Sequence, residues 1–69
     1  MNIVAVNNLI LALTHLAISE RILARTMEQI DHATAVKIRE LAIGHEIHVS
    51  ALSDQLQAEM DRRLPGAPV

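Results

Sequence analysis

The sequence predicts an all-α protein: an antiparallel helical hairpin that assembles into a homo-oligomer, most simply a homodimer with a four-helix bundle. Hydrophobic residues make up 51% of the 69 residues, although none of them is aromatic. They recur at alternating intervals of three and four residues, which is typical of one face of a helix. The chain has no cysteine, so disulfides cannot stabilise so small a core, and a second copy is the expected substitute.

The first helix is expected over about 3–30, a segment without glycine or proline. Asn2 or Asn7 is expected to cap its start, because an asparagine side chain accepts a hydrogen bond from the free amides of the first turn. Its main apolar stripe consists of Val6, Ile10, Leu13, Ala17, Glu20, Ala24 and Met27. Leucine or isoleucine flanks this stripe at every seventh position, at Leu9, Leu16, Leu23 and Ile30.

A turn is expected at about 31–33, where polar residues interrupt the pattern. Asp31 suits the N-cap of the following helix. The alternative is a single helix of about 60 residues, roughly 90 Å long. That helix would place Asp31 and Thr34 at consecutive positions of the apolar stripe, so the hairpin is favoured.

The second helix is expected over about 33–63. Its stripe runs through Ile38, Ala42, His45, Val49, Leu52, Leu56, Glu59 and Arg63. Gly44 falls on the opposite face, and it is expected inside the helix despite a cost of about 1 kcal/mol relative to alanine. Pro65 disfavours helix at the preceding residue. The hairpin domain therefore spans 1–64, and 65–69 are expected to form a disordered tail.

A turn near Asp31 also predicts which side chains of the two helices meet. The expected aliphatic contacts are Ile30 with Ala35, Leu23 with Leu41, Leu16 with Val49 and Leu9 with Leu56. These contacts would close the hairpin along its whole length.

A second apolar stripe lies on a different side of both helices. A two-helix hairpin cannot cover two faces of each helix, and extended apolar patches on soluble proteins usually mark interfaces. We therefore expect an interface, with another copy or with a different protein, at Leu11, Ile18, Ile22, Val36, Ile43, Ile47 and Ala51.

Glu20 and His45 lie at the centres of the two main stripes and at matching depths. A buried carboxylate is costly unless it is paired, so we expect a buried polar pair that fixes the register of the helices. Adding His48 would give a carboxylate and two imidazoles, a ligand set that suits zinc or iron. The spacing matches no known zinc motif, so no metal and no cofactor is expected, with Glu20, His45 and His48 as lower-ranked candidates.

Arg21, Arg25 and Arg39 are expected along one edge of the hairpin, where they could contact an anion. The alternative is a solvated face with salt bridges, for example between Arg25 and Glu28. Nucleic acid is not expected as a partner, because the net charge is −2 and no aromatic residue is available to stack on a base.

The uncharged stretch over residues 1–19 approaches the length of about 20 residues that a membrane-spanning helix needs. Polar residues interrupt it, and no basic segment precedes it as in a signal peptide. We therefore expect no membrane partner and a cytoplasmic location.

The expected function is that of a small regulatory interaction module. No serine lies in a recognisable nucleophile motif and no glycine-rich phosphate loop is present, so the protein is not expected to be an enzyme. A homo-oligomer that binds or inhibits another protein fits these features. The alternatives are a ligand- or metal-binding oligomer, at the Glu20/His45/His48 or the Arg21/Arg25/Arg39 set, and, less favoured, an RNA-binding hairpin dimer.

Overall fold

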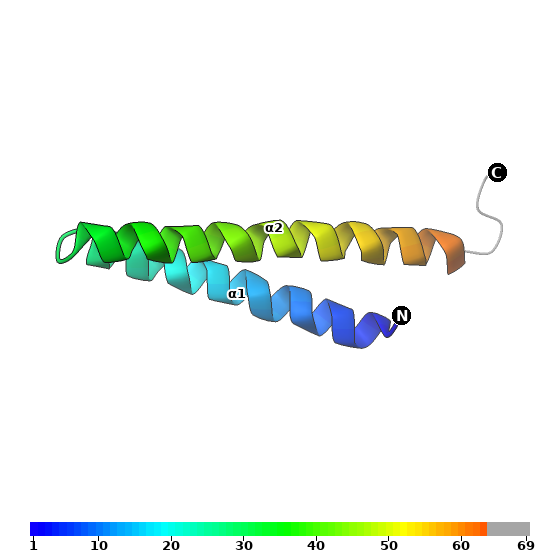
Figure 1. Ribbon diagram of the computed structural model, residues 1–69. Helices are drawn as coiled ribbons and strands as arrows, with labels where there is room; N and C mark the ends of the chain where they lie inside the picture. Colours follow the sequence, from blue (N-terminus) through cyan, green and yellow to red (C-terminus); the bar gives the residue numbers. More distant parts are fainter. Residues whose placement is uncertain (64–69) are drawn as a thin grey trace.

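Two long helices make up the structure. The computed structural model describes residues 1–63, and it contains α1 (Ile3–Met27) and α2 (His32–Arg63), which pack against each other as an antiparallel hairpin (Figure 1). This confirms the all-α hairpin and excludes the single continuous helix. α2 runs without a break through Gly44. The tail expected at 65–69 lies outside the described residues.

The start of α1 is capped by Asn2. Its side-chain oxygen accepts a hydrogen bond from the Ala5 amide at 3.0 Å, and its own backbone is extended. Such a bond satisfies one of the amides that have no partner in the first turn of a helix. Of the two predicted caps, Asn2 therefore takes this role, while Asn7 lies inside the helix.

The turn between the helices is organised by Asp31, the predicted N-cap. The Asp31 carboxylate accepts hydrogen bonds from the Thr34 hydroxyl at 2.6 Å and from the Thr34 amide at 3.3 Å. These bonds lower the pKa of Asp31, with the bond from the Thr34 hydroxyl as the largest cause.

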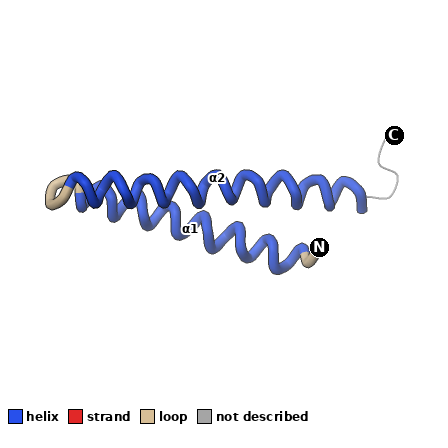
Figure 2. The backbone as a smooth tube through the Cα atoms, in the orientation of Figure 1, coloured by secondary structure: helices blue, strands red, loops and turns tan. Residues whose placement is uncertain are grey.

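The first helix is shorter than predicted. It ends at Met27 rather than near residue 30, and the turn occupies 28–31 rather than 31–33. The Ile30 and Asp31 amides both donate to the Met27 carbonyl, at 2.9 and 2.7 Å. Asp31 is the N-cap of α2 and therefore lies outside that helix. The three residues between Met27 and Asp31 form the turn (Figure 2).

The buried core of the described hairpin consists of alanine. Ala24, Ala35 and Ala42 are 0% exposed and Ala17 is 2% exposed. The two alanines of each helix lie seven residues apart, so they face the partner helix at successive contacts. Small side chains at these positions let the helices approach closely. Towards the open end larger aliphatic residues take over these positions, remain partly exposed, and the helices diverge in Figure 1.

The aliphatic contacts predicted along the hairpin are not its core. The leucines and isoleucine expected to form them are largely exposed: Leu9 43%, Leu16 45%, Leu23 49%, Leu41 56% and Ile30 74%. Successive helix residues are rotated by about 100°, so a residue next to a buried alanine points sideways. The centre of the contact is occupied by alanines, of which Ala17, Ala24 and Ala42 belong to the predicted main stripes, and the leucines that flank these stripes lie beside it.

Enlarging a core alanine is expected to destabilise the hairpin. Ala24→Leu adds three carbon atoms where the helices touch, and overpacking of this kind costs about 1–3 kcal/mol. Urea unfolding followed by circular dichroism measures the change in free energy. Ala58→Leu is the matched control, because Ala58 is an exposed residue of α2. Equal stabilities of the two variants would show that the alanines do not form the close contact.

The Asp31 cap is expected to give a pH-dependent contribution to stability. The pKa of Asp31 is lowered in the folded chain, so the contribution is complete above pH about 4 and is lost as the pH falls through the lower folded pKa. Asp31→Ala should lower the melting temperature at pH 7, and this difference should shrink in acid. Asp54→Ala changes an exposed carboxylate of α2 and should show no such pattern; a constant Asp31→Ala difference at all pH values would contradict the cap.

Candidate functional site

The alanine core divides the surface of the hairpin into two broad faces. On α1, Leu16 precedes and Ile18 follows the buried Ala17, so the two side chains lie on opposite sides of the contact between the helices. Ile18 lines a shallow hollow together with Glu46 of α2. This hollow identifies the side of α2 that belongs to the same face as Ile18.

One face is crossed by two ion pairs between the helices, and we call it the ion-pair face. Arg21 donates to both carboxylate oxygens of Glu46, at 2.7 and 2.6 Å, and Arg39 pairs with Glu28. The hydrogen bonds from Arg21 lower the pKa of Glu46, and those from Arg39 and then His32 lower the pKa of Glu28. All these groups are substantially exposed to solvent, so each pair contributes little to stability.

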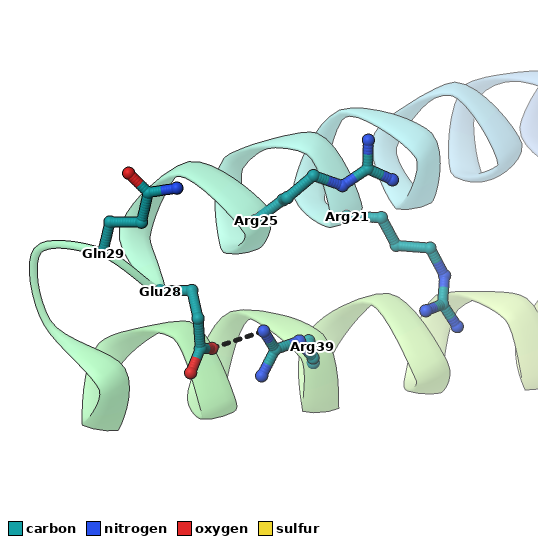
Figure 3. A pocket seen from close by; sticks show the side chains of 5 residues that line it. All are labelled: Arg21, Arg25, Glu28, Gln29 and Arg39. Carbon is teal, nitrogen blue, oxygen red and sulfur yellow. Dashed lines mark hydrogen bonds and ion pairs between the residues drawn. The ribbon is translucent and has the colours of Figure 1, made fainter.

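The three arginines predicted along one edge do come together on this face. Arg21, Arg25 and Arg39 line one open pocket of about 350 Å³, together with Glu28 and Gln29 (Figure 3). The suggested Arg25–Glu28 salt bridge is wrong, because Glu28 binds Arg39 and His32 instead. Within residues 1–63, no hydrogen bond or ion pair involves the Arg25 guanidinium.

The second apolar stripe is exposed throughout. Its exposed fractions run from 37% at Val36 to 65% at Ile47. The remaining members are exposed as well, at Leu11, Ile18, Ile22, Ile43 and Ala51. Nothing in the hairpin covers these side chains, so they are available for contacts with another molecule.

The opposite side of α1 carries Leu9, Leu16 and Leu23, and Ile30 of the turn continues their spacing; we call these four residues the leucine row. They are seven residues apart and 43–74% exposed. Sequence reasoning missed this surface, because it assigned the row to the interior of the hairpin. The signal was present in the seven-residue spacing from Ala17 to Ala24 and from Ala35 to Ala42, which marks the contact line on each helix.

Glu20 and His45 face each other across the helices. His45 Nε2 lies 3.4 Å from Glu20 Oε1, and the two side chains are 28% and 14% exposed. Glu20 Oε1 is buried without a hydrogen-bond partner. His48 does not join them: it is exposed, and no three histidine, aspartate or glutamate side chains within residues 1–63 gather into a possible metal site.

α1 is long and apolar enough to cross a membrane by length and composition alone. An 18-residue stretch of Ile3–Met27 has a mean hydropathy of 1.5, and only 6% of this stretch is buried in the hairpin. The apolar character of α1 is therefore mostly a property of its surface. We therefore expect another molecule to cover the apolar surface of α1.

Comparison with known proteins gives no family or relative. The chain matches no protein-family model, and no curated protein or solved structure matches it.

The Glu20–His45 pair is expected to matter through the cost of an unpaired carboxylate. His45→Leu should destabilise the hairpin by about 1–3 kcal/mol, because the buried Glu20 carboxylate then loses the imidazole nitrogen that faces it. Glu20→Leu combined with His45→Leu should recover most of this loss, since a well-packed apolar pair can replace a buried ion pair without loss of stability. Thermal melts with and without a chelator measure both effects. A neutral His45→Leu would contradict the pairing, and a chelator effect on the wild type would support a metal.

Proposed function

We propose that this chain is a small, non-enzymatic, cytoplasmic interaction module that forms a homo-oligomer through α1 and binds or inhibits another protein through the ion-pair face. One observation carries the proposal. The core of the hairpin consists of four alanines, while large aliphatic side chains remain exposed on both faces. A core of this size contributes little hydrophobic free energy to folding. We therefore expect the stable form of the chain to be an assembly.

The leucine row is the better surface for self-association. Its four members are uncharged. Among its neighbours on α1, Ala12 and Ser19 are small and uncharged, and Glu20 is 14% exposed beside His45. Two copies of α1 packed antiparallel about a two-fold axis would bring two such rows together, with the spacing of a coiled coil. On α2 the same side offers mainly polar residues besides Leu41, so α1 would dominate the contact.

The hydrophobic free energy gained from this contact is comparable to the free-energy cost of association. Fully burying a leucine or isoleucine contributes about 1.5–3 kcal/mol, and the four residues of the row are 43–74% exposed, or about half on average. Two copies therefore gain about 6–12 kcal/mol. This offsets much of the 4–15 kcal/mol that association is estimated to cost in lost freedom of motion.

The ion-pair face is less suited to self-association and better suited to a different protein. Any partner on this face has to desolvate the Arg21–Glu46 and Arg39–Glu28 pairs, which is costly. A different protein can offset this cost with complementary polar groups, whereas a second copy presents the same ion pairs. Its mixture of isoleucines and arginines resembles interfaces between different proteins, where arginine is enriched. The Glu20–His45 pair, by contrast, is already mostly buried within the hairpin, so covering the leucine row adds little further desolvation.

A matched pair of variants is expected to identify the self-association face. Leu16→Glu and Ile18→Glu introduce the same charge on either side of Ala17, at positions with similar exposure of 45% and 53%. Multi-angle light scattering should give at least twice 7.6 kDa for the wild type. Leu16→Glu should dissociate the assembly, because it would bury an unpaired charge, whereas Ile18→Glu should leave it intact.

Other outcomes of this experiment would overturn parts of the proposal. Dissociation by Ile18→Glu alone would place self-association on the ion-pair face instead. A stable wild-type monomer would remove the oligomer altogether. A wild-type chain that stays in solution only with detergent would assign the apolar surface of α1 to a lipid bilayer.

A further inference from the structure

The arginine pocket, formed by Arg21, Arg25 and Arg39, is unusual in holding three guanidinium groups around one open space of about 350 Å³. Two of them are fixed by carboxylates: Arg21 by Glu46 and Arg39 by Glu28. In Figure 3, Arg21 reaches from α1 towards α2, whereas Arg25 stays beside α1. The pocket lies within one chain and does not depend on self-association.

The local charge balance is positive. Three guanidinium groups meet two carboxylates, one lining the pocket and one beside it, and no carboxylate within residues 1–63 pairs with Arg25. The dipoles of the helices have little influence here, because the negative end of α1 and the positive end of α2 both lie at the turn. An anion in the pocket would relieve the mutual repulsion of the three cations.

The ion pairs leave donors free for such an anion. A guanidinium has five N–H donors, and Arg21 uses its Nε and Nη2 groups for Glu46, whereas Arg39 uses its Nη2 group for Glu28. The carboxylates therefore hold these two side chains in place without occupying all of their donors. Arg25 keeps its full set.

We propose that the arginine pocket is a binding site for a phosphate group. A phosphate monoester carries about −1.5 to −2 charges at pH 7 and presents three acceptor oxygens. Three oxygens can each accept from a different guanidinium group, and the charge of a phosphate balances more of the positive charge in the pocket than the single charge of a carboxylate would. Arg25 supplies the uncompensated charge, and Arg21 and Arg39 supply oriented donors.

The test is a titration of isotope-labelled full-length protein with sodium phosphate at pH 7 and constant ionic strength, followed by NMR. The arginine Nε–H signals of Arg25, Arg21 and Arg39 should shift saturably. Arg25→Gln should weaken binding by about tenfold, as expected for the loss of a charged hydrogen-bond donor. Arg62→Gln removes the same charge at the other end of the hairpin and should leave the affinity unchanged.

A second titration with O-phosphoserine distinguishes the source of the phosphate. Tighter binding of phosphoserine would point to a phosphorylated protein segment, and equal binding to a free phosphate compound; both support the site. Equal weakening by Arg25→Gln and Arg62→Gln, or shifts spread over all arginines without saturation, would overturn it. Circular dichroism of Arg25→Gln checks that the helices are intact. The result is independent of the oligomeric state measured by light scattering.

Discussion

The close contact between α1 and α2 rests on four alanine side chains, and the other features of the hairpin are arranged around it. Because alanine extends only one carbon from the backbone, the helices can approach closely at Ala17, Ala24, Ala35 and Ala42. Polar side chains on either side of this line then come within reach of the opposite helix. The Arg21–Glu46 and Glu20–His45 pairs lie on the two sides of it. The same closeness leaves no room between the helices for larger neighbours, which therefore remain on the surface.

A hairpin built in this way gains little from its own folding. Hydrophobic stabilisation scales with the apolar area removed from water, and alanine has little area to remove. The aliphatic residues with more area, such as Leu16 and Ile22, remain half exposed. Stability and interaction are thus coupled in this chain, since the surfaces that would bind other molecules also hold most of the unused hydrophobic free energy. Such a chain is expected to be most stable when its faces are covered.

The sequence allowed the fold to be predicted because its periodicity and caps are local properties. The 3.6-residue period of the stripes and the capping side chains of Asn2 and Asp31 all act over a few residues. The sequence also predicted that Glu20 and His45 face each other, because a short turn fixes the register of the two helices. The exposure of the leucine row was not predicted, because the period marks the alanine line as the main stripe but does not show whether the flanking leucines are drawn into the contact or left on the surface. That choice depends on side-chain size across the interface, where alanine excludes leucine from the centre.

The arginine edge shows the same limit for polar residues. The sequence placed Arg21, Arg25 and Arg39 on one edge, but it paired Glu28 with the wrong arginine. Glu28 lies at the start of the turn rather than within a regular helix, so the three-residue spacing to Arg25 did not decide its partner. Its carboxylate instead reaches His32 and Arg39, both of which belong to α2. Side-chain pairing at the end of a helix depends on the path of the turn, which periodicity does not describe.

Within residues 1–63 the buried residues all lie between positions 17 and 42, so local stability is expected to fall from the turn towards the open end of the hairpin. The turn and the alanine contacts on either side of it form a unit of short-range contacts, and such units form early in folding because little loop entropy is lost. The open end, where α1 begins and α2 finishes, has weaker packing and would open without unfolding the rest. Its helical turns can therefore adjust their separation to whatever molecule they meet, while the turn end keeps its shape.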